Sequence, residues 1–148
     1  MKVLLQRVQK AQVIVAEEVV GAIEQGLLLY VGFKRGDDES VIAPHVDKVL
    51  NLRIFDDEAG KMNLSVQDVG QDLLVVSQFT LYGETQKGRR PSFTNALSSD
   101  LSEIYYQKFI AECQKKYSMG KVEEGKFGAN MIVCAENLGP INFMIELS

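Results

Sequence analysis

The stretch from Asp72 to Leu81, DLLVVSQFTL, is the strongest strand signal in the chain. Its first half is a run of leucine and valine, which favour a buried, pleated surface. Its second half places the polar side chains of Ser77, Gln78 and Thr80 where the strand ends. Such groups need hydrogen-bond partners or a cleft, and ligand sites prefer such positions. We therefore expect a buried strand that leads into a candidate site.

The segments on either side predict a sheet around this strand. Val3–Val15 and Val19–Ile23 are rich in β-branched residues and flank a short polar turn, which predicts an antiparallel hairpin. Leu27–Phe33 is continuously apolar, which predicts a strand covered on both faces. Two more strands are expected near Val122–Ala135 and Ile141–Leu147.

Two segments have helical periodicity. The first, around Val41–Leu52, accommodates Pro44 only within its first turn, where a missing N–H costs nothing. The second runs from about Asp100 to Tyr117. Its predicted inward face carries four residues at i+4 steps: Leu101, Tyr105, Phe109 and Cys113. A mostly antiparallel sheet carrying two helices, either α/β or α+β in layers, is the expected architecture.

Composition limits the class of protein. The chain has 148 residues, of which 46% are hydrophobic and 24% charged, which fits one globular domain. No apolar run approaches the roughly 20 residues that cross a bilayer, and a signal-peptide core is missing. Cys113 and Cys134 are expected to be packed, reduced thiols. These features predict a cytoplasmic protein without a membrane partner.

Charge and residue types narrow the chemistry further. The net charge of −4 argues mildly against nucleic acid. A local basic patch could still bind it, and the candidates are Lys87, Arg89 and Arg90, with Lys115, Lys116, Lys121 and Lys126 further along the chain. His45 is the single histidine and lies inside a predicted helix, so a serine or cysteine triad is not indicated. Zinc-ligand clusters, phosphate loops and dinucleotide fingerprints are also missing, so no metal or cofactor is expected.

A second unusual segment is Asn137–Asn142, NLGPIN. The simpler interpretation is a turn before the last strand. Alternatively, the bond before Pro140 is cis, and two neighbouring carbonyls then point the same way and can grip an ammonium group. The sequence leaves both possibilities open.

Taken together, these residues resemble the D-aminoacyl-tRNA deacylase family. The resemblance extends over nearly the whole chain and rests on several ordered motifs. These are Leu5–Val8, Leu52–Phe55, Gly60–Leu64, Val75–Leu81, Lys87–Phe93 and Gly139–Pro140.

The resemblance implies a layered β/β/α fold of the α/β class over residues 1–148, with mostly antiparallel sheets forming a barrel-like core and two main helices. It also implies a homodimer with active sites at the interface, the aminoacylated 3′ end of tRNA as substrate, and no cofactor. Gly139 and Pro140 would be a Gly-cis-Pro motif that one subunit inserts into the site of the other. Met131 would lie near the substrate, and Arg7 would hold the Gly-Pro segment.

The expected reaction is hydrolysis of the ester between a D-amino acid and tRNA, with Ser77, Gln78, Phe79 and Thr80 as the catalytic wall. Backbone N–H groups of Phe79 and Thr80 can stabilise the oxyanion, and the resemblance implies help from the 2′-hydroxyl of the tRNA. Thr80 lacks an evident activating base, so we expect it to position substrate. An L side chain would collide with the Gly-Pro backbone, whereas glycine would pass.

Two residues depart from the family pattern. Leu138 stands where a polar residue is common, and Asn142 where threonine is usual. Two alternatives stay open. The lack of an evident side-chain base leaves open a binding module without catalysis, and the two departures leave open a related editing hydrolase that tolerates L-amino acids, with Pro140 trans. A purely structural protein would not explain the polar end of the Asp72–Leu81 segment.

Overall fold

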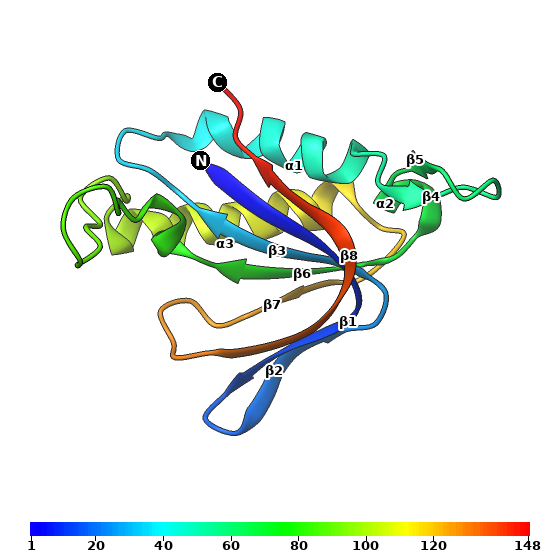
Figure 1. The fold of residues 1–148 in the computed structure, drawn as a ribbon, viewed down its shortest axis with the longest axis horizontal. Helices are drawn as coiled ribbons and strands as arrows, with labels where there is room; N and C mark the ends of the chain where they lie inside the picture. The colour runs from blue at the N-terminus through cyan, green and yellow to red at the C-terminus, as the bar shows by residue number, and fades with distance from the viewer.

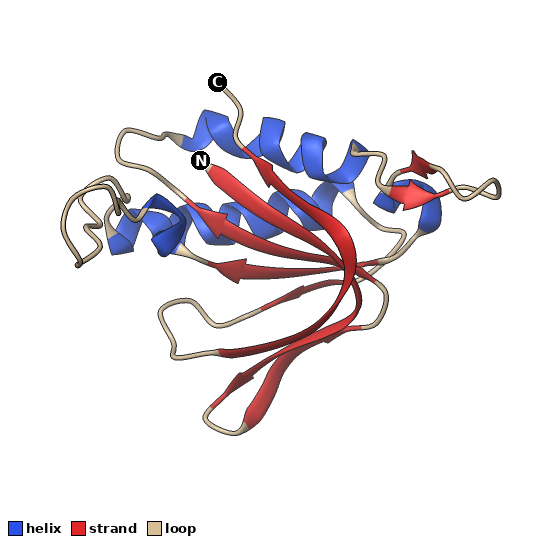
Figure 2. Cartoon of the chain, in the orientation of Figure 1, coloured by secondary structure: helices blue, strands red, loops and turns tan.

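The computed structural model describes all residues, 1–148, and is built on one strongly bent sheet with two long helices on one side (Figure 1, Figure 2). The sheet order is β2-β1-β3-β6-β7, and β8 pairs with the other edge of β1. The strands are β1 (Lys2–Val15), β2 (Glu18–Ile23), β3 (Gly26–Gly32), β6 (Asp72–Ser77), β7 (Val122–Glu124) and β8 (Ile132–Ile145).

Strand β1 is the centre of the sheet because it has three partners. Its first half pairs with β3, from Lys2↔Gly32 to Val8↔Gly26, and its second half pairs with β2. Strand β8 follows β1 along most of its length (Figure 1). These three pairings are antiparallel, as the sequence predicts, whereas β3–β6 and β6–β7 are parallel.

The sheet closes almost into a barrel because β2 comes back against β7. A Cβ atom at Gly21 in β2 would collide with the main-chain oxygen of Glu124 in β7. Glycine is therefore required for this close approach of two backbones. The layered, barrel-like α/β fold expected from the sequence is the one observed.

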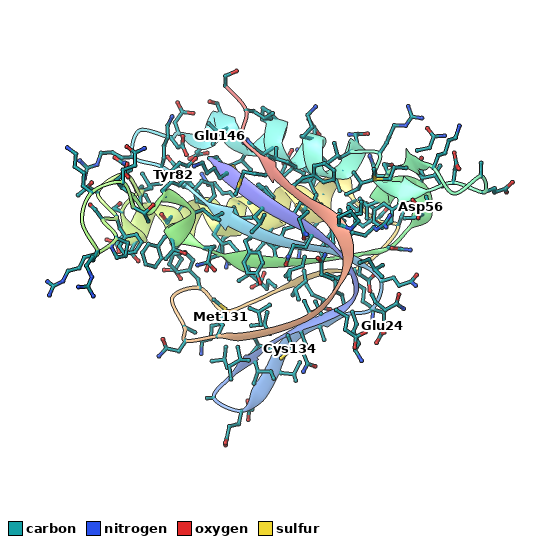
Figure 3. All side chains as sticks on the ribbon, viewed as in Figure 1. Glu24, Asp56, Tyr82, Met131, Cys134 and Glu146 are labelled. Atoms are coloured by element: carbon teal, nitrogen blue, oxygen red, sulfur yellow. The ribbon has the colours of Figure 1, made fainter.

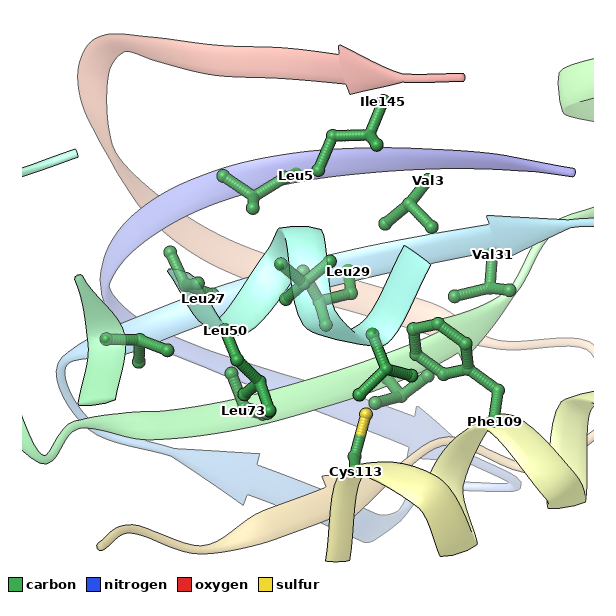
Figure 4. Close-up of a cluster of buried hydrophobic side chains, with 14 of the residues drawn as sticks. Val3, Leu5, Leu27, Leu29, Val31, Leu50, Leu73, Phe109, Cys113 and Ile145 are labelled. Atoms are coloured by element: carbon green, nitrogen blue, oxygen red, sulfur yellow. The ribbon is translucent and has the colours of Figure 1, made fainter. Parts of the chain in front are cut away.

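Two helices, α1 (Ile42–Asn51) and α3 (Ser99–Lys116), cover one face of the sheet. Between that face and the helices lies the larger core cluster, in which Leu29 and Val75 of the sheet join Phe109 of α3 (Figure 4). Alternate residues such as Leu28 point into a smaller cluster on the opposite face. Strand β3 is therefore buried on both faces, as its unbroken apolar sequence predicts.

Both predicted helices are confirmed, but only Phe109 and Cys113 of the predicted inward face of α3 are buried. Leu101 is 43% exposed, and Tyr105 is only partly buried. The buried residues of α3 are Ser102, Tyr106, Phe109, Ile110 and Cys113. A run of i+4 steps drifts around a helix of 3.6 residues per turn, so the true face mixes i+3 and i+4 steps.

The C-terminal part of the chain differs most from expectation. Strand β7 has only three residues, and β8 continues through Gly139 and Pro140, where a turn was one of the two interpretations. Cys134 lies on β8 and is exposed, so the expectation of a packed thiol holds for Cys113 alone. The apolar neighbours of Cys134 predict a packed thiol, but Cys134 alternates with Val133, which packs against the smaller core cluster, so the Cys134 side chain lies on the opposite, outward face of β8.

The remaining elements are short. The hairpin of β4 (Phe55–Asp56) and β5 (Met62–Leu64) and the helix α2 (Val66–Val69) lie at one end of the molecule. There are two 3₁₀ turns: η1 (Glu39–Val41) precedes α1, and η2 (Phe79–Tyr82) follows β6. No helix is both long and apolar enough to span a membrane.

Candidate active site

A cleft of about 570 Å³ opens where β3 and β6 end. Its lining includes three of the predicted catalytic residues, Ser77, Gln78 and Phe79, together with Met131 on the segment leading into β8 (Figure 3). The structure therefore brings four of the predicted site residues together. Thr80 follows directly in the chain and is exposed.

The backbone at the end of β6 sets the position of the polar wall. The N–H of Gln78 donates to the carbonyl of Val31 in β3 (2.7 Å), which extends the parallel pairing by one residue. The chain then turns into η2, so the strand ends at Ser77, earlier than the stretch to Leu81 predicted. A Cβ at Gly32 would lie 2.7 Å from the Gln78 carbonyl oxygen, so glycine lets the two segments cross closely.

The start of η2 presents backbone donors. Its first turn bond runs from the N–H of Leu81 to the carbonyl of Gln78 (3.3 Å). The amides of Phe79 and Thr80 precede that bond and have no partner within the turn. The side-chain amide of Gln78 donates to the hydroxyl of Thr80. This arrangement can hold an oxyanion and orient a hydroxyl, but it contains no group that would remove a proton from Thr80.

The cleft carries almost no titratable chemistry. Tyr106 is the one ionisable side chain in its lining, and burial raises the pKa of Tyr106 far above its usual value of 10. The phenol donates to the carbonyl of Val75 (2.8 Å). The chain contains no group of three or more His, Cys, Asp or Glu side chains that could hold a metal ion. The cleft can therefore bind and orient a substrate, while the proton acceptor must come from elsewhere.

His45 is remote from this chemistry. It is 1% exposed in α1, its Nδ1 donates to the carbonyl of Val41 (2.7 Å), and its Nε2 accepts from the N–H of Leu147 (3.3 Å). Both ring nitrogens are engaged, and burial lowers the pKa of His45 below 6.5, which fits a neutral ring. His45 thus joins α1 to the C-terminal segment.

Gly139 and Pro140 lie away from the cleft of their own chain. In the β1–β8 ladder, Asn142 pairs with Gln6 and Asn137 with Val8, so the residues between them bulge out opposite a single residue of β1. Both Gly139 and Pro140 are exposed, and the peptide bond between them is cis. Neither residue lines the cleft described above.

Arg7 is the residue of β1 that faces this bulge. Its carbonyl accepts a hydrogen bond from Nδ2 of Asn137 (2.9 Å). Its guanidinium donates to the carbonyl of Ile54 (2.8 Å) and lies 3.5 Å from a carboxylate oxygen of Asp56. Within one chain, Arg7 is thus near the Gly-Pro bulge and remote from the cleft, since Asp56 and Met131 are well separated (Figure 3).

Sequence reasoning missed the residues that fix the base of the bulge. Nδ2 of Asn142 donates to Oδ1 of Asn137 (3.1 Å), and Oδ1 of Asn142 accepts from Gln6 (3.0 Å). Asn142, which stands where the family pattern has threonine, therefore links Gln6 to Asn137 through side-chain hydrogen bonds. The two asparagines that flank Gly-Pro were the available signal.

The far side of the cleft was also missed. Ser99 and Ser102 come from the start of α3, and Tyr106 and Phe127 form a tilted aromatic pair with ring centroids 5.8 Å apart. These residues belong to segments distant in sequence, so no local pattern joins them to Ser77.

Comparison with known proteins gives one consistent answer. The sequence model of the family described as D-Tyr-tRNA(Tyr) deacylase matches residues 4–146. A D-aminoacyl-tRNA deacylase from Exiguobacterium sp. is 51% identical over 146 residues, which are 99% of this chain and 98% of that protein. A protein of the same name from Clostridium tetani is 47% identical, over 99% of this chain and 97% of that protein.

Solved structures share the fold of this chain. The c-Myc DNA Unwinding Element Binding Protein has a TM-score of 0.94 and 38% identity, covering 100% of this chain and 99% of that one. A probable eukaryotic D-amino acid tRNA deacylase has a TM-score of 0.86 over 99% of this chain and 98% of that one, and at 20% identity it supports the fold alone.

The family model and these relatives place the chain among the hydrolases, on a fold whose cleft is lined by Ser77, Gln78 and Phe79. The chain belongs to the D-Tyr-tRNA(Tyr) deacylase family. Its activity is that of a D-aminoacyl-tRNA deacylase.

Proposed function

We propose that this deacylase removes D-amino acids from the 3′ end of tRNA in the cytoplasm, and that residues 1–148 act as one domain. The observation that carries the proposal is the cleft at the end of β6, whose wall of Ser77, Gln78 and Phe79 offers polar groups and backbone donors without a charged side chain. An aminoacyl ester is already activated, so positioning and oxyanion stabilisation are what its hydrolysis needs.

In the proposed reaction, water attacks the ester carbonyl, and the amides of Phe79 and Thr80 stabilise the oxyanion. The carbon–oxygen bond to the ribose then breaks, and the ribose oxygen takes up a proton. The neighbouring 2′-hydroxyl of the tRNA assists, because the cleft lining contains no side-chain base. Thr80 holds the substrate through its hydroxyl and does not form an acyl-enzyme.

The chiral filter is proposed to be the exposed Gly139–Pro140 segment of a second copy of the chain. Its carbonyls would grip the α-ammonium group, so that the side chain of an L-amino acid meets the Gly-Pro backbone while a D side chain points away. A filter that works by steric exclusion of L side chains also accepts glycine, which has no side chain. In this arrangement Arg7 supports the segment from β1, and Met131 faces the substrate.

The homodimer has its own support in β8. This strand of 14 residues has a hydrogen-bonded neighbour on one edge only. Its exposed apolar residues are Ile132 at 64%, Leu138 at 37%, Phe143 at 38% and Met144 at 51%. A long, apolar, unpaired edge strand favours association with another surface, and a second copy supplies one.

The first test is release of amino acid from tRNA charged with D-tyrosine, L-tyrosine or glycine at catalytic enzyme concentration. We expect loss of D-tyrosine and of glycine, with L-tyrosine retained. Stoichiometric binding without turnover would instead indicate a binding module. Equal loss of both tyrosine forms would indicate an editing hydrolase without the proposed filter.

Subunit mixing tests the shared site. A Pro140→Ala chain and a Gln78→Ala chain are each expected to be inactive alone. Random re-association makes half of the dimers mixed, and each mixed dimer has one intact site, so about one quarter of wild-type activity returns. A site contained within one chain would give no recovery of activity. Independently, a folded and active monomer, detected by size exclusion with light scattering, would contradict the shared site.

A further inference from the structure

We propose that the loop Gly83–Phe93 and the Phe79–Phe93 aromatic pair bind the single-stranded 3′ segment of tRNA just before the aminoacylated nucleotide. This inference rests on the proposed function for the identity of the ligand. It adds a second contact region, which begins at Phe79 on the wall of the cleft and extends along the loop, for a part of the substrate that does not react.

The loop is a cationic segment in an acidic chain. It carries Lys87, Arg89 and Arg90 against one carboxylate, Glu84, whereas the whole chain has a net charge of −4. Residues 85–91 are all exposed. None of the three cations belongs to an ion pair, although Lys2, Lys10, Lys108, Lys115 and Lys116 all do. Unpaired, exposed cations are available to phosphates.

The loop is also anchored to the wall of the cleft. It leaves η2 directly, and its two ends are joined by hydrogen bonds between Glu84 and Ser92 in both directions (2.7 and 3.0 Å). Figure 1 shows the segment between β6 and α3 as a protruding loop at the end of the molecule where β6 stops. A ligand held by this loop is therefore held next to the cleft.

Two exposed phenylalanines lie at the junction of loop and cleft. Phe79 is 55% exposed and Phe93 is 38% exposed, and their rings meet edge to face with centroids 5.0 Å apart. Solvent-exposed rings next to unpaired cations form a stacking platform for nucleobases whose phosphates the cations neutralise. Duplex nucleic acid hides its base faces, so the combination favours a single strand.

The test is binding of uncharged tRNA, measured by fluorescence anisotropy as a function of salt. The variant Lys87→Gln/Arg89→Gln/Arg90→Gln should flatten the slope of log affinity against log salt by about 2, at about 0.7 for each phosphate contact. The affinity should fall on the order of 10²-fold at 0.1 M salt and converge with wild type near 1 M. Phe93→Leu should weaken binding by at least about five-fold with an unchanged slope.

The matched control removes the same charge elsewhere. Lys48, Lys61 and Lys121 are exposed and outside any ion pair, and their triple glutamine variant should keep the wild-type slope. An equally reduced slope of log affinity against log salt in this control would overturn the proposal, because the effect would then come from the loss of positive charge anywhere on the protein. So would a wild-type slope in the Lys87/Arg89/Arg90 variant, whose folding is checked by its thermal unfolding.

Two further substrates locate the contact. With tRNA from which the single-stranded 3′ nucleotides have been removed, the loop variant should bind as wild type does; a persisting loss would place the contact on the duplex and refute this inference. Turnover of D-tyrosyl adenosine, which has no phosphates, should be unchanged in the loop variant, and an equal loss there would also refute it. A salt-dependent, loop-dependent affinity without any ester turnover would leave the inference standing and refute the proposed function.

Discussion

Replacement of Gly139 by alanine should separate folding from catalysis, because the added methyl group has room within its own chain. A Cβ built at Gly139 comes near one atom only, Oδ1 of Asn137, at 3.7 Å. That is ordinary van der Waals contact. Gly139 is exposed and its φ lies outside the left-handed region, so alanine can adopt the same backbone conformation.

The two effects of this substitution should have opposite signs. Glycine-to-alanine changes at compatible positions stabilise a protein by about 0.4–1 kcal/mol, because the unfolded chain has fewer conformations to lose. In the proposed dimer, the same methyl group enters the partner's cleft beside the substrate. Forcing a methyl group into a fitted site costs about 1–3 kcal/mol, so kcat/KM on D-tyrosyl-tRNA should fall about 5- to 150-fold.

The assay pairs chemical denaturation with release of D-tyrosine, and Gly60→Ala is the matched control. Gly60 lies in the β4–β5 turn with a φ of +73° and nothing within 4 Å of a built Cβ. Alanine there should lose about 1–2 kcal/mol of stability through backbone strain while kcat/KM is unchanged. Wild-type kcat/KM in a folded Gly139→Ala enzyme would refute the assignment of this backbone to the substrate.

Two further predictions concern the fold. Burial lowers the pKa of His45 below its ordinary 6.5, so as pH falls the unfolded chain takes up the proton first. The free energy of unfolding should therefore decrease between pH 6.5 and pH 5. In urea titrations at several pH values, His45→Gln should show a smaller decrease than wild type, and an equal dependence on pH in both proteins would contradict this. Tyr106→Phe should cost only about 0.5–1.5 kcal/mol of unfolding free energy, because the Val75 carbonyl keeps its bond from the N–H of Gly125 (2.9 Å). A loss above 3 kcal/mol in thermal and urea unfolding would argue for a larger role of the phenol.

The type and spacing of apolar residues were enough to predict the strands and helices that bury one or both of their faces. The hairpin β1–β2 and the apolar strands β3 and β6 follow from residue type and period alone. The polar wall of the cleft followed from Ser77 and Gln78, because polar side chains stood at the end of an apolar strand. Both helices were found for the same reason, although the inward face of α3 was found only in part.

Tertiary arrangement was beyond the sequence. The order of β3, β6 and β7 depends on long connections whose ends no local pattern relates. The far wall of the cleft joins Ser102 and Phe127 to Ser77 only after folding. The passage of β8 through Gly139–Pro140 was hidden because Gly-Pro equally predicts a turn. The second subunit remains a prediction from the resemblance and from the exposed edge of β8.

The pairing of β1 with β8 has a consequence for how the protein is made. Their contacts join residues far apart in the chain, such as Gln6 and Asn142, which are 136 positions apart. Closing so long a loop costs conformational entropy, and the edge of β1 that pairs with β8 has no partner until residues 132–145 have been synthesised. During that wait the nascent protein is exposed to aggregation and to chaperones. The bulge that carries Gly139 and Pro140 takes its place only at the end, so only a chain that has completed its sheet can present it.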